Sequence, residues 1–176
     1  MKSALLTEAP VFGAIALHQP EAPMPQLSLH SPIGDITIAE EDGAVVSVDW
    51  GWVQHQTETP LLVRAKAQLQ GYFDGLLQQF DLPLAPAGTT YQLRVWQALA
   101  AIPYGQTRTY ADIARQAGGS ARSVGQANGR NPLPLLIPCH RVVASVGLGG
   151  YSGGDGIEAK TWLLARETRT AAGRAA

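Results

Sequence analysis

The chain has 176 residues, a formal net charge of −1 and a hydrophobic content of 45%. These values indicate one packed globular domain or two small ones and exclude an intrinsically disordered chain. No apolar run approaches the ~20 residues that span a bilayer, so we expect a cytoplasmic protein that does not contact a membrane.

Charge is divided unevenly along the chain. Residues 1–89 hold three basic and ten acidic side chains, whereas residues 90–176 hold ten basic and four acidic ones. The second half is therefore a candidate for contacts with phosphate groups. A solvated surface with uneven charge explains the same counts equally well.

The chain begins with a proline-rich stretch that we interpret as a flexible leader, residues 1–25. The stretch "LSLHSPIGDITIAEEDGAVVSVDW" that follows alternates apolar and polar residues around the pair Asp42-Gly43. This alternation predicts antiparallel strands joined by a tight turn.

An amphipathic helix is predicted behind Thr59-Pro60, because apolar residues recur at helical spacing from Leu62 to Phe80. Together with the strands it predicts a small N-terminal α/β domain at residues 26–85. The stretch "DLPLAPAGT" is interpreted as the linker.

The second half predicts a mostly helical domain at residues 90–168, with a frayed tail at 169–176. A short strand, "HRVVAS", and a glycine-rich loop, "GLGGYSGGDG", interrupt it. The fold class is therefore α+β. Four helices are predicted: Tyr91 to Ala101, Tyr110 to about Ala117, Ser120 to about Gly129, and Ile157 to about Glu167.

The stretch "YADIARQAGGSARSVGQANGR" has the spacing of a helix-turn-helix. Ile113 and Val124 are placed to pack the two helices together, and Gly118 lies where the turn needs a positive φ. Small side chains on the second helix favour close approach to the minor groove, with little sequence preference. Helix pairs of this shape also occur as plain core structure. The candidate DNA-binding residues are Ala121, Arg122, Ser123, Gly125, Ala127, Asn128 and Arg130.

The chain has one cysteine, Cys139, in "NPLPLLIPCHRVV". A single cysteine excludes an internal disulfide, and the four histidines show no paired ligand spacing, so we expect no metal and no cofactor. A lone cysteine is usually a small buried hydrophobe. Here, however, His140 and Arg141 follow the sulfur, which favours the reactive thiolate, and three prolines stiffen the approach.

These motifs together resemble the O6-alkylguanine-DNA alkyltransferases. The resemblance rests on "IPCHRVV", preceded by "ARSVGQANGRNP" and followed by "GYSGG" and "KTWLLARE", and runs from about Tyr91 to Glu167. It implies a DNA-repair protein that takes an alkyl group from O6-alkylguanine in one irreversible reaction. Activity on O4-alkylthymine is left open. The implied partner is double-stranded DNA containing the lesion, with no obligatory protein partner.

The resemblance also implies a role for each matching residue. Cys139 would accept the alkyl group, His140 would deprotonate the thiol through a water molecule, and Glu167 would orient the imidazole. Asn131 would brace the turn before the cysteine. Arg122 would enter the base stack when the damaged nucleotide is flipped out.

The remaining implied residues form a pocket for the flipped base. Tyr110 and Ser152 would donate hydrogen bonds to the guanine, and the backbone carbonyls of Cys139 and Val142 would accept from its exocyclic amine. Tyr151 and Pro134 would form pocket walls.

Two features depart from the family pattern. The loop "GGDGIEA" is slightly longer than in some relatives, which affects the register of Glu167. Asn128 stands where some relatives carry a larger apolar residue, which predicts altered tolerance of bulky adducts. Three alternatives remain at this point: a non-catalytic lesion sensor, a helix-turn-helix regulator and a thiol hydrolase.

Overall fold

The computed structural model describes residues 23–174, which form a small sheet with one helix followed by a mostly helical part. The α+β class predicted from the sequence is confirmed. Most of the leader predicted for residues 1–25 lies outside the described residues and stays a prediction.

The N-terminal sheet has three antiparallel strands in the order β1-β2-β3, namely β1 (Gln26–Leu29), β2 (Ile36–Glu41) and β3 (Ala44–Trp50). The predicted tight turn joins β2 to β3, where Asp42 and Gly43 have φ values of 50° and 77°. Two consecutive positive φ values are what a type I′ hairpin turn requires, which explains the aspartate-glycine pair.

Helix α1 (Pro60–Phe73) packs against this sheet. Its first turn is capped by Thr59, whose side chain accepts from the Leu62 amide at 3.1 Å, and proline fits the first helical position. The helix ends seven residues before the predicted Phe80, because Gly75 has a φ of 75°, in the left-handed region. The predicted apolar stripe is buried: Leu62, Ala65, Leu69, Tyr72 and Phe73.

The helical part confirms the predicted order of the four helices, and β4 is a short strand that was not predicted. Where "HRVVAS" was predicted as a strand, however, a single 3-10 turn comes first and only two residues are extended. The elements are α2 (Thr90–Ala100), β4 (Arg108–Thr109), α3 (Tyr110–Ala117), α4 (Ala121–Asn128), the 3-10 turn Cys139–Arg141, β5 (Val142–Val143) and α5 (Ile157–Arg174).

Helix α5 differs from the prediction, since it continues past Glu167 to Arg174 where a frayed tail was expected from residue 169. Its last turns have tertiary partners that the sequence does not reveal. The backbone of Gly105 lies so close to Ala171 that a Cβ on the glycine would come within 3.0 Å of the alanine side chain. Packing of this kind holds a helix end that would otherwise fray.

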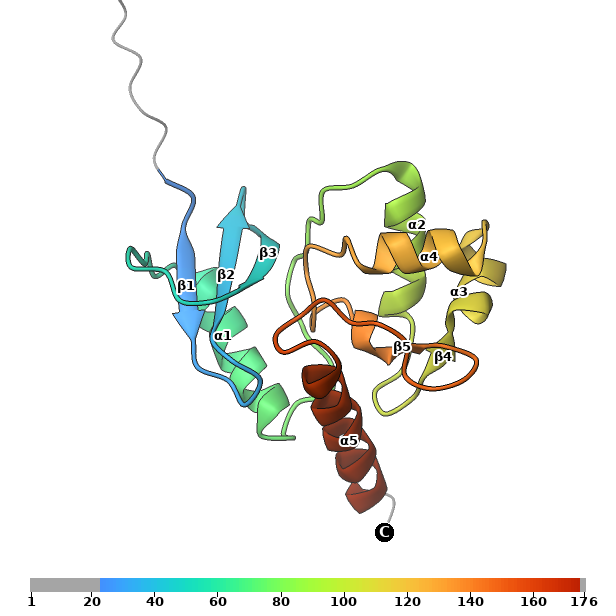
Figure 1. Ribbon diagram of the computed structural model, residues 1–176. Helices are drawn as coiled ribbons and strands as arrows, with labels where there is room; N and C mark the ends of the chain where they lie inside the picture. The colour runs from blue at the N-terminus through green and yellow to red at the C-terminus, as the bar shows by residue number, and fades with distance from the viewer. Residues whose placement is uncertain (1–22, 175–176) are drawn as a thin grey trace, which may run out of the picture.

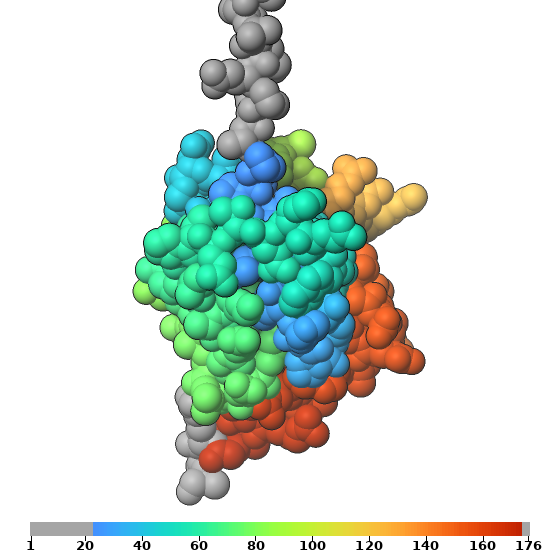
Figure 2. Space-filling model, turned by 90° about the vertical axis from the view of Figure 1, so that its left-hand side faces the viewer, coloured from blue at the N-terminus to red at the C-terminus, as the bar shows by residue number. Residues whose placement is uncertain are grey.

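The two parts share one hydrophobic core and are also joined by backbone hydrogen bonds. The Val48 amide on β3 donates to the Pro132 carbonyl at 2.8 Å, and Val45 exchanges bonds with Pro83 and Ala85 of the linker. In Figure 1 the sheet and α1 lie on the left, α2, α3 and α4 on the right, and α5 below and between them. Figure 2 shows the face formed by the N-terminal part, with C-terminal residues emerging along its right and lower edges.

Among residues 23–174, no helix has the length and apolar character needed to cross a bilayer.

Candidate active site

Cys139 is the first residue of the 3-10 turn and is only 5% exposed. Burial raises the pKa of its thiol, because a buried thiolate loses hydration. Hydrogen bonding from Asn131 and Tyr151 and the charge of Lys160 act in the opposite direction. The sulfur is therefore held in a site where thiolate formation needs assistance from neighbouring groups.

We call residues 131–139 the cysteine segment. Asn131 holds it from both sides, because its Nδ2 donates to the Ile137 carbonyl at 2.8 Å and its Oδ1 accepts from the Leu133 amide at 3.0 Å. Between these contacts Leu135 has a φ of 74°, a left-handed conformation that strains a side-chain-bearing residue. The brace and the prolines fix where the segment delivers the sulfur.

His140 is fully buried beside Glu167, and its Nε2 lies 2.8 Å from Glu167 Oε1. An ionised carboxylate only accepts, so Nε2 carries the proton and the neutral ring has its lone pair on Nδ1. Nδ1 is buried and has no hydrogen-bond partner among the described residues. Burial lowers the pKa of His140, although Glu167 opposes this, so the resting imidazole is neutral and able to take up a proton.

Glu167 receives hydrogen bonds from three groups besides His140. The Tyr72 hydroxyl donates to Oε1 at 2.7 Å, the Gly105 amide donates to Oε2 at 3.0 Å, and the Arg141 guanidinium donates to both oxygens. Burial alone raises the pKa of Glu167, but the hydrogen bonds from His140 and Arg141 and the charge of Arg141 outweigh it and lower the pKa to about 2. The carboxylate is therefore ionised at any physiological pH.

Lys160 is a fully buried cation that donates to three backbone carbonyls, those of Val142, Leu148 and Gly150, at 2.6, 2.7 and 3.2 Å. It thereby ties the glycine-rich loop to the strand after the cysteine. The Val142 carbonyl was expected to accept from the guanine amine, but Lys160 already donates to it and Val142 is fully buried. Val142 also lines neither of the two cavities that border Cys139, which are described next.

Two cavities border the sulfur. The larger, about 300 Å³, is lined by Tyr110 and by Gly125 of α4, and we call it the base cavity. The smaller, about 170 Å³, is lined by Pro134 of the cysteine segment and by Trp50 of β3, and we call it the side cavity. Both cavities are bordered by the same four residues: Asn128, Cys139, Tyr151 and Ser152.

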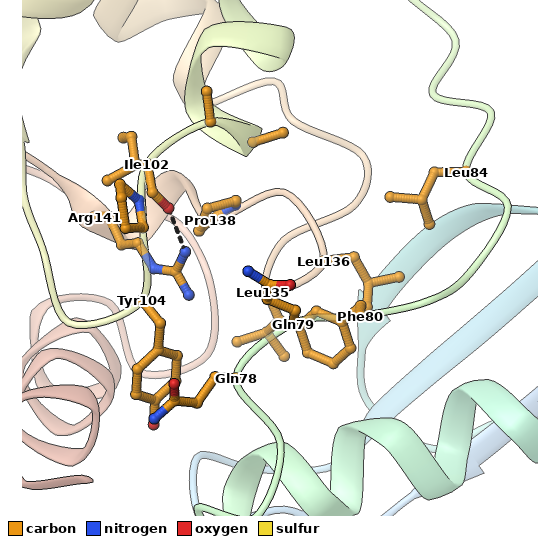
Figure 3. A pocket seen from close by; sticks show the side chains of 13 residues that line it. Gln78, Gln79, Phe80, Leu84, Ile102, Tyr104, Leu135, Leu136, Pro138 and Arg141 are labelled. Atoms are coloured by element: carbon orange, nitrogen blue, oxygen red, sulfur yellow. Dashed lines mark hydrogen bonds between the residues drawn. The ribbon is translucent and has the colours of Figure 1, made fainter. Parts of the chain in front are cut away.

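A third cavity, about 400 Å³, is larger than either but lies away from the sulfur. Figure 3 shows it between Phe80, which precedes the linker, and Pro138 and Arg141 on either side of Cys139, with the 2.7 Å bond from Arg141 to the Ile102 carbonyl drawn. Cys139 does not line this cavity, so it is not the place for a group that reacts with the thiol.

The predicted helix-turn-helix is present. Ile113 and Val124 are fully buried between α3 and α4, Gly118 has a φ of 82°, and Ser120 caps α4 by accepting from the Ser123 amide at 3.2 Å. These local predictions are confirmed.

The predicted DNA-facing residues of this motif divide into three groups. Ala121, Arg122 and Arg130 are exposed, and Ser123 and Gly125 are half-buried. Ser123 also serves the cap of α4 and lies 2.8 Å from the Tyr91 hydroxyl.

Ala127 and Asn128 were predicted to contact DNA from an exposed face of α4, but the structure buries both. They are 3% and 6% exposed, because with Val124 they form the i, i+3, i+4 stripe that α4 presents to the core. The Ala127 carbonyl accepts from the Trp96 indole at 2.9 Å, and Asn128 Nδ2 donates to the Cys139 carbonyl at 3.3 Å. Asn128 is thus a residue of the cavities rather than of the outer surface.

Sequence reasoning missed four groups at the site: Tyr72, Gly105, Arg141 as a partner of Glu167, and Lys160. One available signal was the spacing of Lys160, Leu163 and Glu167, which places all three on one face of α5 with a buried leucine between two charges. Tyr72 carried no local signal, since it lies in the apolar stripe of a helix in the other half of the chain.

Comparisons with known proteins agree across the chain. Two family profiles match, the 6-O-methylguanine DNA methyltransferase ribonuclease-like domain at residues 27–86 and the DNA binding domain of the same family at residues 90–169. The constitutive methylated-DNA–protein-cysteine methyltransferase of Bacillus subtilis is 46% identical over 148 residues, covering 76% of this chain and 89% of that protein.

Solved structures give the same result. The crystal structure of Mycobacterium tuberculosis O6-methylguanine methyltransferase superposes with a TM-score of 0.73 at 39% identity, covering 84% of this chain and 94% of that one. A Mycobacterium tuberculosis relative crystallised in complex with DNA gives a TM-score of 0.74 at 42% identity, covering 82% and 93% of the two chains.

Proposed function

The chain belongs to the O6-methylguanine DNA methyltransferase family, and from this premise we propose that it repairs O6-alkylguanine in DNA by transferring the alkyl group irreversibly to Cys139. The observation that carries the assignment is the position of the sulfur. It borders a cavity beside α4, while the neighbouring His140 is paired with an ionised Glu167.

The first step is loss of the thiol proton. His140 is the general base and accepts the proton at Nδ1, and a bridging water molecule would carry the proton there from the sulfur. Glu167 accepts from Nε2 and stabilises the imidazolium that forms, and Arg141 and Tyr72 keep that carboxylate in place. This arrangement supports the roles expected for Cys139, His140 and Glu167.

The second step is in-line attack on the alkyl carbon. A bond forms from sulfur to carbon, the carbon–O6 bond breaks, and the electron pair stays on the purine, which takes up a proton. Burial raises the pKa of Tyr110, so its hydroxyl stays protonated and can donate to the departing base in the base cavity. Ser152 lines the same cavity and is the second donor we propose.

Entry of the base requires DNA bound against α4 and the nucleotide rotated out of the duplex. Arg122 is exposed near the start of α4, where it can fill the space that the base leaves. Ala121, Gly125 and the exposed Arg130 would lie along the minor groove, where small side chains permit close contact. We propose duplex DNA as the partner, with the protein acting in the cytoplasm as a monomer without an obligatory protein partner or cofactor.

Intact mass after incubation with duplex DNA containing O6-methylguanine tests this function. We expect one methyl group in place of one hydrogen on the peptide that contains Cys139, with one event per protein molecule. Cys139→Ala should show no change, and neither should wild type with unmodified DNA. A lesion sensor or a regulator would bind without a mass change, and a thiol hydrolase would form many products per molecule.

A further inference from the structure

Asn128 has a polar atom, Oδ1, that has no role in the proposed alkyl transfer. Its Nδ2 faces the Cys139 carbonyl, which can only accept, so the orientation of the amide is fixed and Oδ1 points the other way. Asn128 is 6% exposed, and Oδ1 is buried without a hydrogen-bond partner among the described residues. A buried acceptor without a donor is costly, which makes it a recognition group for a ligand that supplies one.

Oδ1 belongs to a residue that borders both cavities beside the sulfur. The base cavity adjoins α4 and Tyr110, so the purine enters there, with O6 directed towards Cys139. In-line attack places the sulfur, the first alkyl carbon and O6 in a row, so any further atoms of the alkyl group must point to one side of that line. The side cavity offers them about 170 Å³, close to the size of an engineered cavity that holds benzene.

Another buried polar group, the Tyr151 hydroxyl, borders both cavities but already serves the sulfur. Tyr151 Oη also has no partner that meets hydrogen-bond geometry, but it interacts with the sulfur and lowers the pKa of Cys139. A phenol can stabilise a thiolate only as a donor, so we assign this proton to the sulfur. Among the buried side-chain atoms of both cavities that lack a partner, Asn128 Oδ1 is the acceptor left for the substrate.

We propose that the site favours hydroxyalkyl lesions, with Asn128 Oδ1 accepting a hydrogen bond from the terminal hydroxyl of O6-(2-hydroxyethyl)guanine. This rests on the proposed function. The sulfur bonds to the carbon attached to O6, the carbon–O6 bond breaks, and the electron pair remains on the purine, which takes up a proton. The thiol proton goes to His140, and S-(2-hydroxyethyl)cysteine is left at position 139.

Single-turnover transfer rates from three duplexes test this preference. The duplexes carry O6-methylguanine, O6-propylguanine or O6-(2-hydroxyethyl)guanine, of which the last two have the same number of heavy atoms in the side chain. The measured quantity is the hydroxyethyl-to-propyl rate ratio. We expect this ratio to be about fivefold to tenfold higher in wild type than in Asn128→Leu, because a buried acceptor is satisfied by only one of the two substrates.

Two further variants make the comparison specific. Asn128→Met should give the same low ratio as Asn128→Leu, and serves if the leucine variant does not fold. Asp49→Ala removes another polar group that lines the side cavity and should keep the wild-type ratio.

The preference is overturned if the ratio is equal in wild type and the Asn128 variants, as it would be if Asn128 served the base and all three rates fell together. It is also overturned if Asp49→Ala loses the high ratio. Failure of wild type to take the methyl group would instead reject the proposed function itself, and with it the preference, so the two failures are distinguished by the methyl duplex.

Discussion

Tyr72 and Glu167 stand 95 residues apart in the chain and are joined by a 2.7 Å hydrogen bond from the phenol to the carboxylate. The tyrosine lies on α1 of the N-terminal part and the glutamate on α5. The same oxygen, Oε1, also faces His140 Nε2. The N-terminal part therefore supplies one of the groups that hold the proton-accepting pair in place.

Removing this hydroxyl should weaken both the fold and the reaction. We expect Tyr72→Phe to lower the free energy of unfolding by about 1.5–3 kcal/mol, the range for buried hydrogen bonds to charged groups. Transfer to Cys139 should slow severalfold, with a changed pH–rate profile, since Glu167 then holds His140 less firmly. Urea unfolding and single-turnover rates from pH 6 to about pH 9 measure the two effects.

Tyr104→Phe is the matched control for that variant. The Tyr104 ring packs edge-on against Tyr72 with centroids 6.0 Å apart, but its hydroxyl has no hydrogen-bond partner among the described residues. Its removal should leave stability and rate close to wild type. Equal losses in the two variants would mean that the bond to Glu167 has no particular role.

Glu167 should make the protein sensitive to acid in a defined window. Its pKa is lowered from the ordinary 4.5 to about 2 in the folded state, so between these values the unfolded chain binds more protons and folding is penalised. The stabilisation is complete above about pH 4.5 and is lost as the pH falls towards 2, amounting to about 3 kcal/mol.

The free energy of unfolding, followed by urea titration at several pH values between about 2 and 5, measures this dependence. Glu167→Gln should be less stable than wild type at neutral pH and should lack this part of the slope. Parallel curves for the two proteins would show that Glu167 titrates normally.

The thiol of Cys139 should react slowly with small alkylating agents at neutral pH. Burial raises its pKa above the ordinary 9.0, so the thiolate fraction grows only at higher pH. The rate of modification by iodoacetamide, followed by intact mass, should still be rising at about pH 9. Tyr151→Phe should move the curve to higher pH, because the hydroxyl lowers the thiol pKa; a shift to lower pH would contradict this assignment.

Arg122→Ala should impair repair of duplex DNA but not the chemistry of the site. We expect the single-turnover rate on duplex DNA to fall by about tenfold, since Arg122 supports the extruded nucleotide, while the rate on a free O6-alkylguanine base is unchanged. Arg115→Ala on α3 is the control, because that exposed arginine pairs with Asp112. Equal losses on duplex and free base would place Arg122 in the chemistry instead.

The local features of the fold were predictable because they depend on a few neighbouring residues. Short motifs specify the local structure at three places: the helix start at Thr59-Pro60, the turn at Asp42-Gly43, and the turn and cap from Gly118 to Ser120. The order of motifs around Cys139 likewise indicated the family, which the comparisons confirm. These are short-range signals that a single sequence carries in full.

The features that were missed depend on distant contacts. Tyr72 looked like one more residue of an apolar stripe, and only the packing of α1 near α5 gives its hydroxyl a carboxylate partner. The last turns of α5 looked like a tail because Gly105 is far from them in sequence. Asn128 was assigned to the exposed face because polar residues are rarely buried, and only the fold brings its Nδ2 to the Cys139 carbonyl.

The backbone bonds from β3 to the linker and to Pro132 have a mechanical consequence. They join the sheet to the linker and to the cysteine segment, which opposes separation of the two halves around a lesion. The protein therefore presents a largely preformed binding surface to DNA. The conformational change needed for repair is then made by the DNA rather than by the protein. Lesions that already weaken base pairing in their duplex should therefore be repaired fastest.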